Sequence, residues 1–349
     1  MHMADALLSP AVGGTLWAAT AAMTWHCSRR VRETLDDQTI PLMGVLGAFI
    51  FAAQMINFTI PGTGSSGHLG GGLLLAILLG PHAAFLVMAS VLTVQALVFA
   101  DGGLLALGAN IFNMAVLPCF VAYPLIYKPL VGAHPTPGRI TLAAVLAAVV
   151  GLQLGAFGVV LETVVSGISE LPFSAFVLLM LPIHLGIGLV EGLVTAAVVN
   201  FIWAAQPDIL RHAATARPLG QPLLKKVLIG LGVTAVITGG ALSWFASTYP
   251  DGLEWSIAGV SGAEEIAHPD DGIHATLSAV QQQTAILPDY GFGAADADSR
   301  PGQEQDHAEA PVWPAVDPAT SLAGLVGGAL TLLIAVGIGW LLRRRTASA

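Results

Sequence analysis

Met1 and His2 present the nitrogen atoms of a compact metal chelate. The α-amine of Met1, the amide nitrogen of His2 once deprotonated, and the imidazole Nδ1 of His2 would close two adjacent rings around one ion. These atoms fill three corners of a square, an arrangement that Ni²⁺ and Cu²⁺ accept. Alone, the pair is better explained as an ordinary start, because every protein begins with Met and some have His next.

A fourth nitrogen ligand is available at His68, which lies in the glycine-rich segment 61–72. Glycine adopts positive φ and permits close backbone approach, as a loop folded back into a helical bundle requires. Irregular backbone at membrane depth is tolerated only where it lines a protein-enclosed cavity. A flexible surface loop with an incidental histidine is the plainer interpretation. Because glycines bracket His68 so tightly, we favour a functional loop that completes the square.

Three further polar residues, Gln54, Asn57 and Gln95, lie in or beside apolar runs, where an unpartnered polar side chain is costly. They could support a buried imidazole or join helices by hydrogen bonds. For Gln54 and Gln95 we favour interhelical hydrogen bonds. Asn57 lies near the end of its predicted helix, and for this residue both interpretations are equally favoured.

His184 and Glu191 lie two helical turns apart on one face of another apolar segment. They define the alternative function, an intramembrane metal-dependent enzyme. A structural hydrogen-bond network explains such a pair more often, and no His-Glu-x-x-His motif or third ligand accompanies it. A passive copper channel is a weaker option, because the eight methionines form no stripe.

The composition of the chain places all these residues in a membrane protein. The 349 residues are 55% hydrophobic and 10% charged, with a mean hydropathy of +0.76, whereas soluble domains carry about 25% charged residues. Cys27 and Cys119 both lie in apolar stretches, which excludes a disulfide scaffold. The 13 basic residues are too scattered for nucleic-acid binding. We therefore predict an all-α polytopic membrane protein.

Apolar runs of suitable length predict nine membrane spans. We place them at residues 9–27, 40–60, 69–79, 82–100, 104–127, 140–165, 172–203, 227–245 and 321–342. The run 73–100 is divided because Gly80-Pro81 interrupts it. With the N-terminus outside and the C-terminus in the cytoplasm, twelve of the 13 basic residues face inward, as the positive-inside rule requires. No cleavable signal peptide is expected, because basic residues follow the first span instead of preceding it.

The negative charge of the chain is concentrated in the predicted outer loop 246–319, which has 13 acidic residues and one arginine. The loop could simply be solvated, which we slightly favour, or it could concentrate cations at the outer mouth. No lysine follows a glycine, so no P-loop is present and ATP hydrolysis is expected on separate subunits. The small-residue stripe Gly44/Ala48/Ala52 is a candidate surface for such a partner, and internal packing explains it equally well.

Several ordered motifs together resemble one transporter family, the CbiM/NikM family. They are Met1-His2, Ile56-Asn57-Phe58, Gly62-Thr63-Gly64-Ser65-Ser66-Gly67-His68, Leu78-Leu79-Gly80-Pro81, Gln95-Ala96-Leu97, Phe99-Ala100-Asp101-Gly102-Gly103, Gly108-Ala109-Asn110-Ile111-Phe112-Asn113-Met114 and the segment from His184 through Glu191 to Thr195. Members of this family are substrate-specific components of energy-coupling factor (ECF) transporters for cobalt and nickel. The match covers about residues 1–203. The segment Pro250-Asp251-Gly252-Leu253-Glu254 and the last span resemble the N-type accessory component.

The resemblance implies a seven-helix ECF S-component bundle plus two further transmembrane helices. Its N-terminal segment would enter the bundle, and Met1, His2 and His68 would hold Ni²⁺ or Co²⁺ as transported substrate, without a cofactor. The implied partners are a coupling membrane subunit (T component) and ABC ATPase subunits at the cell membrane. We divide the chain into a metal-binding domain (1–205), a cytoplasmic linker (206–226) and an accessory unit (227–349).

Overall fold

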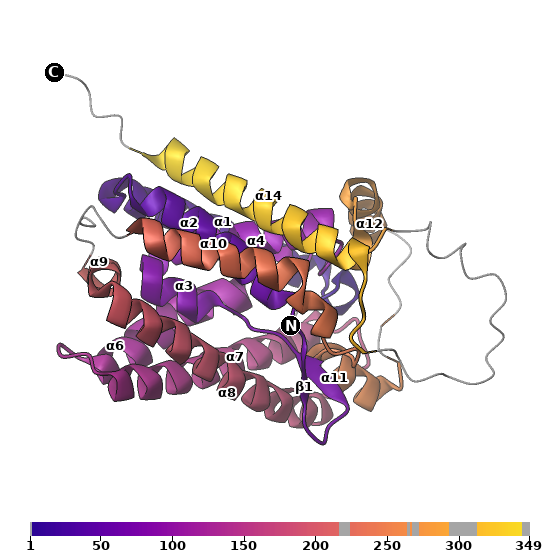
Figure 1. The fold of residues 1–349 in the computed structure, drawn as a ribbon. Helices are drawn as coiled ribbons and strands as arrows, with labels where there is room; N and C mark the ends of the chain where they lie inside the picture. The colour runs from indigo at the N-terminus through magenta and orange to yellow at the C-terminus, as the bar shows by residue number, and fades with distance from the viewer. Residues whose placement is uncertain (1, 216–223, 264–265, 267–271, 293–312, 344–349) are drawn as a thin grey trace.

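The computed structural model describes residues 2–215, 224–263, 266, 272–292 and 313–343, and most of them are helical (Figure 1). The first part of the chain forms η1 (Asp5–Leu7), α1 (Pro10–Thr34), α2 (Thr39–Gln54), β1 (Phe58–Ile60), β2 (Ser65–Gly67), α3 (Gly72–Leu79), α4 (Pro81–Val98), α5 (Leu107–Ile111), η2 (Phe112–Val116), η3 (Pro118–Tyr127), α6 (Lys128–Val131), α7 (Pro137–Ser166), α8 (Phe173–Ala205) and α9 (Pro207–Thr215). The second part forms α10 (Leu224–Gly240), η4 (Leu242–Phe245), α11 (Gly252–Ser261), α12 (Gly272–Thr284), η5 (Pro288–Tyr290) and α14 (Pro318–Leu342).

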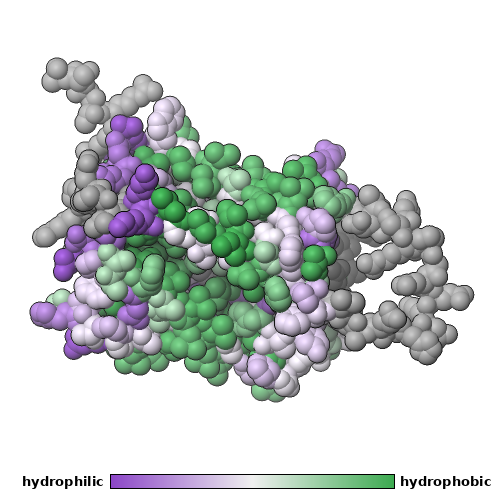
Figure 2. Space-filling view, in the orientation of Figure 1, coloured by the Kyte–Doolittle hydropathy of each residue, from purple (hydrophilic) through white to green (hydrophobic). Residues whose placement is uncertain are grey.

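Long apolar helices run along the molecule and confirm a helical, multi-pass membrane protein. Among the described residues, five helical stretches are long and apolar enough to cross a membrane: Pro81–Val98, Leu107–Val131, Pro137–Ser166, Phe173–Ala205 and Pro318–Leu342. Figure 2 shows a broad hydrophobic band over the middle of the molecule and more polar ends. Large apolar side chains such as Leu193, Phe201 and Leu333 are exposed on these helices, as contact with lipid requires. The total of nine spans stays a prediction.

The break at Gly80-Pro81 is confirmed. Helix α3 ends at Leu79 and α4 begins at Pro81, with Gly80 between them at φ 77°. Glycine adopts this left-handed value without a Cβ clash. Proline fits the first position of α4 because that position needs no intrahelical N–H donor.

The predicted second span is wrong at its end. Helix α2 stops at Gln54, and residues 58–60 form β1, which pairs antiparallel with β2 through Phe58↔Gly67 and Ile60↔Ser65. Gly62 and Gly64 have φ values of 78° and 74° in the connecting turn, which is the left-handed region that glycine tolerates. This hairpin places His68 against the helical bundle. We call the end of the molecule that carries β1 and α11 (at the right in Figure 1) the hairpin end.

Helix α14 covers the small-residue stripe on α2, so the interpretation of this stripe as a partner surface is wrong. A Cβ atom on Gly44 would lie 2.5 Å from Cγ2 of Val336 and 3.2 Å from the carbonyl oxygen of Leu332. Both neighbours belong to α14. Ala48 and Ala52 are buried as well. The small residues therefore serve close helix packing inside the chain.

Candidate metal centre

The N-terminal segment is inserted into the bundle and fixed there through its main chain. Met3 is completely buried. Its N–H donates to Oδ1 of Asn110 (2.8 Å), and its carbonyl accepts from Nδ2 of Asn110 (3.3 Å) and from the N–H of Gly103 (2.9 Å). One asparagine thus satisfies both polar main-chain groups of Met3, as buried backbone requires. Met1 lies outside the described residues.

Two further contacts hold the segment beyond Met3. The buried carboxylate of Asp5 accepts from the N–H of Ala106 (2.9 Å). A Cβ atom on Gly103 would collide with this carboxylate, because it would lie 1.9 Å from Oδ1 of Asp5. His274 of α12 approaches the carbonyl oxygen of Leu8 at 2.9 Å through Nε2, which is therefore the donor. Both parts of the chain therefore help to hold the N-terminal segment in place, and we call these contacts the clamp.

The structure brings together the two predicted histidine ligands. The imidazole rings of His2 and His68 are stacked, with centroids 5.0 Å apart and planes inclined by 11°. Nδ1 of His68 donates to the carbonyl of Leu69 (3.1 Å), which leaves the lone pair on Nε2 available for a metal. Burial, the largest cause, and the neighbouring His2 lower the pKa of His68 to about 3. A neutral imidazole is the form that binds metal.

His2 also contacts a carboxylate that the sequence did not single out. Its Nδ1 lies 3.0 Å from Oδ1 of Asp101, while its Nε2 is buried without a hydrogen-bond partner. Tyr290 donates a short hydrogen bond to Oδ2 of the same carboxylate. Burial raises the pKa of Asp101, but the charge of His2 and hydrogen bonds from His2 and Tyr290 outweigh it and lower the pKa to about 2. Chelation through Nδ1 therefore requires the His2 ring to turn away from Asp101.

The glycine loop that carries His68 is held by the polar residues of neighbouring helices. The carboxylate of Glu191 accepts from the N–H groups of Gly70 (2.8 Å) and Gly71 (3.0 Å). Gln54 donates to the carbonyl of Gly70 (2.9 Å), and Gln95 donates to Oε1 of Gln54 (2.8 Å). The favoured interpretation of these three side chains, structural hydrogen bonding, is confirmed. The network fixes the backbone of Gly70 and Gly71 and thereby the position of the nearby His68.

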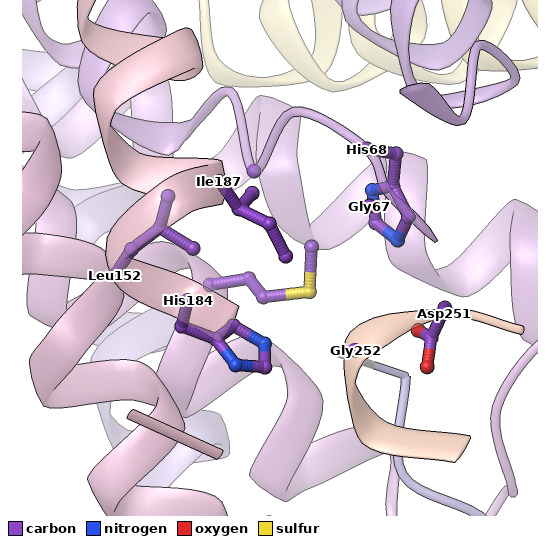
Figure 3. Close-up of a pocket in the computed structure, with 9 residues that line it drawn as sticks. Gly67, His68, Leu152, His184, Ile187, Asp251 and Gly252 are labelled. Carbon is purple, nitrogen blue, oxygen red and sulfur yellow. The ribbon is translucent and has the colours of Figure 1, made fainter. Parts of the chain in front are cut away.

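His184 and Glu191 have different partners in the structure. Nδ1 of His184 donates to the carbonyl of Met180 (2.8 Å), and its buried Nε2 has no hydrogen-bond partner. Figure 3 shows His184 across a small cavity from His68 and Asp251. The cavity volume of about 10 Å³ is roughly that of one water position. His184 and Glu191 therefore have separate partners, which removes the structural basis of an enzyme site formed by this pair.

The segment Pro250–Glu254 packs against the hairpin and α8. Asp251 accepts from the N–H groups of Leu253 (2.7 Å) and Glu254 (2.9 Å), while Glu254 accepts from the N–H of Asp251 (3.0 Å). This reciprocal capping box starts α11. The carbonyl of Pro250 accepts from the N–H of Ser66 (2.8 Å). This hydrogen bond fastens the second part of the chain to the hairpin two residues before His68.

A polar cavity of about 630 Å³ opens at the hairpin end and reaches both histidines. The acidic side chains in its lining come from both parts of the chain and include Asp101, Asp251, Glu254, Asp289 and Asp317. Asn57 also lines this cavity, and its main-chain carbonyl accepts from the N–H of Ser247 (2.7 Å). A supporting role for the Asn57 side chain stays a prediction. Carboxylates around an entrance attract divalent cations.

Sequence reasoning missed Asn110, Asp101 and Tyr290. Asn110 and Asp101 stand within the family motifs of the sequence, and a polar residue in or beside an apolar run is itself a signal of a buried polar contact. Tyr290 offered no signal, because it lies far along the chain in the acidic loop. Among the described residues, no group of three or more His, Cys, Asp or Glu side chains could hold a metal ion. This finding leaves the predicted chelate untested, because that chelate contains only two imidazoles and otherwise uses main-chain nitrogens.

Comparison with known proteins gives two family matches. The model of the cobalt uptake substrate-specific transmembrane region, CbiM, matches residues 2–209, and the PDGLE domain matches residues 225–344. The fused nickel transport protein NikMN of Rhodobacter capsulatus is 31% identical over 316 residues, which are 83% of this chain and 88% of that protein. The putative fused nickel transport protein NikMN of Archaeoglobus fulgidus is 38% identical over 232 residues, which are 65% of this chain and 74% of that protein.

A solved structure agrees with these matches. The crystal structure of a truncated transition metal transporter is 31% identical, with a TM-score of 0.52, and the alignment covers 58% of this chain and 99% of that one. The relatives of this chain are therefore metal transport proteins. Since the CbiM model spans more than half of its length, the chain belongs to the CbiM family, the cobalt uptake substrate-specific transmembrane region, and carries a PDGLE domain after it.

Proposed function

We propose that this protein is the metal-capture, substrate-specific subunit of an ECF-type importer for nickel or cobalt ions. The observation that carries the proposal is the stacked pair His2 and His68. The N-terminal segment and the glycine loop bring these imidazoles together at the end of an acidic cavity. The metal transport proteins among the relatives support the same class of cargo.

The ion is held by the α-amine of Met1, the amide nitrogen and imidazole of His2, and the imidazole of His68. Four nitrogens in a square favour Ni²⁺, with Co²⁺ next. Cu²⁺ would bind more tightly still and is excluded by its availability in the cell. The ligands release protons as they bind. The buried main-chain contacts of Met3 support this arrangement, because they hold the chain immediately beyond the ligands.

Residues 1–205 form the metal-binding domain, 206–226 a cytoplasmic linker and 227–349 the accessory unit. The hairpin end faces the outside of the cell membrane, and the C-terminus faces the cytoplasm. A coupling membrane subunit and ABC ATPase subunits supply the energy. The distribution of basic residues supports this orientation. The lack of a P-loop in the sequence supports hydrolysis on other chains.

Equilibrium binding of Ni²⁺ and Co²⁺ to the purified full chain tests the site. One variant carries an extra alanine before Met1, and a second is His68→Ala. His26→Ala is the matched control, because His26 is a half-buried histidine near the opposite end of α1. We expect the first two variants to lose roughly 100-fold or more in Ni²⁺ affinity, and the control to bind normally. The intact mass of each protein identifies its first residue: Met1 in the unextended proteins and the added alanine in the extended one.

The visible spectrum gives a second criterion, because square-planar Ni²⁺ absorbs differently from octahedral Ni²⁺. Unchanged affinity in the extended protein would exclude the amine as a ligand. Reconstitution tests the transporter class: vesicles should accumulate Ni²⁺ with ATP only when coupling and ATPase subunits accompany this chain. Accumulation driven by this chain alone would contradict the ECF mechanism.

A further inference from the structure

We infer that Tyr290, in the accessory unit, is a positioning residue for the metal-binding imidazole of His2 and acts through Asp101. This inference rests on the proposed function of His2 as a ligand. The Tyr290 hydroxyl donates to Oδ2 of Asp101, and Oδ1 of the same carboxylate contacts Nδ1 of His2. A single carboxylate thus links a tyrosine late in the sequence to the second residue of the chain.

The ring of Tyr290 is fixed independently of its hydroxyl. It stacks on Phe99, with centroids 4.8 Å apart and planes inclined by 15°, and it also packs near Phe51. The preceding main chain is bonded to the end of α4: the N–H of Leu287 donates to the carbonyl of Val98 (3.1 Å), and the N–H of Asp289 donates to the carbonyl of Phe99 (2.9 Å). The position of the hydroxyl is therefore set by contacts other than its own hydrogen bond to Asp101.

Backbone strain is concentrated at the same junction. Among the described residues, the non-glycine positions with positive φ are Ala100 (56°), Asp289 (50°) and Tyr290 (61°). Ala100 directly precedes Asp101, and the other two form the turn that presents the tyrosine. Such values persist only where the surrounding structure enforces them, and they cluster at ligand-binding sites. Two strained turns from different parts of the chain thus meet at one carboxylate.

The chemistry of a metal-bound histidine explains why this carboxylate matters. When Nδ1 of His2 binds the ion, the remaining ring proton lies on Nε2, which is buried and has no partner in the metal-free protein. A ligating histidine usually donates its second N–H to a carboxylate or carbonyl, which orients the ring and raises its basicity. In the metal-free protein Asp101 contacts Nδ1 itself, so it accepts from Nε2 only after the ring has turned toward the ion. Tyr290 holds the carboxylate in place for this contact. The accessory unit therefore contributes to the site without supplying a ligand.

The test is a double-mutant cycle in the full chain with Tyr290→Phe, Asp101→Asn and the double variant. Phenylalanine keeps the ring that stacks on Phe99 and removes only the hydroxyl. We expect Tyr290→Phe to weaken Ni²⁺ binding by roughly 3- to 10-fold, with no further loss in the Asp101→Asn background. The absorption of bound Ni²⁺ should shift in the same direction in both single variants. Tyr249→Phe is the matched control, because this exposed tyrosine uses its main chain to contact Ser66.

Amide hydrogen exchange in the absence of metal gives a separate measurement. Tyr290→Phe should speed exchange of residues 2–8 by roughly 3-fold or more, and Tyr249→Phe should leave it unchanged. A Tyr290→Phe protein that matches the Tyr249→Phe control in both Ni²⁺ affinity and exchange overturns the inference. So does a loss that is fully additive with Asp101→Asn, because this indicates a general packing defect. If the unmodified chain binds no Ni²⁺, the proposed function fails, while exchange still decides whether Tyr290 holds the segment.

Discussion

The carboxylate of Glu191, in the middle of α8, accepts hydrogen bonds from Gly70 and, through its second oxygen, from Gly71 in the loop that carries His68. The loop forms no helix or strand at this point, so its N–H groups lack regular main-chain acceptors. A glutamate inside a membrane helix accepts from them instead. This relationship connects the rigid bundle to a predicted metal ligand.

Glu191→Gln tests this support. An amide can accept only through its oxygen, so one of the two N–H groups loses its acceptor while remaining buried. We expect a loss of about 1–3 kcal/mol in stability and weaker Ni²⁺ binding, measured by thermal melting in detergent and by metal titration. Glu162→Gln is the matched control, since Glu162 accepts from Asn113 at 2.8 Å and does not contact the loop in any described hydrogen bond. Equal metal affinity in both variants would contradict the role of Glu191.

Asn110→Leu tests the clamp on the N-terminal segment. The substitution keeps the approximate side-chain size but leaves the buried N–H and carbonyl of Met3 without their side-chain partner. Because the segment then docks less often, the apparent Ni²⁺ affinity should fall by roughly 10-fold. Asn200→Leu removes an asparagine of α8 that donates to Thr141 of α7 at 3.0 Å and makes no described hydrogen bond to the segment. This control should keep its affinity, and a similar loss in both proteins would point to a general folding defect.

Gly252→Val tests how closely α11 must approach α8. A Cβ atom at this position would lie 2.7 Å from Cγ2 of Ile183 and 3.1 Å from Cε1 of His184. Since Ile183 is β-branched and stiff, we expect α11 to be displaced at a cost of about 1–3 kcal/mol. Gly337→Val carries the same change on α14, where nothing lies within 4 Å of a Cβ atom. Equal melting temperatures for the two variants would show that the contact is unimportant.

The pH dependence of Ni²⁺ binding separates the ligands. Burial above all, with the charge of His2, lowers the pKa of His68 to about 3, so this imidazole is already neutral at pH 6 and protons do not compete for it there. The amine, with an ordinary pKa of about 8, and the amide must still lose protons. Affinity should therefore fall by at least about tenfold per pH unit between pH 8 and 6. Titrations at three pH values measure the slope, and a flat profile contradicts amine and amide coordination.

Much of the architecture could be predicted because lipid imposes strict rules on sequence. Apolar runs gave the long helices, and Gly80-Pro81 gave the division between α3 and α4. The end of α2 was misplaced, because the apolar residues Phe58 and Ile60 suit a strand as well as a helix, and periodicity does not separate the two in so short a run. The stripe around Gly44 was ambiguous for a related reason. A small-residue face predicts close packing without identifying the helix that packs there.

The membrane class, the family motifs and the two candidate histidine ligands follow from composition and local spacing, which the amino-acid sequence contains directly. Which polar groups meet depends on the tertiary structure. It placed Asn110 on Met3, Glu191 on the glycine loop and Tyr290 on Asp101. Each pair joins residues that are distant in the chain, and each buried polar group could have been satisfied by several others of the same chemistry. The choice among them depends on the packing of whole helices, which local sequence does not specify.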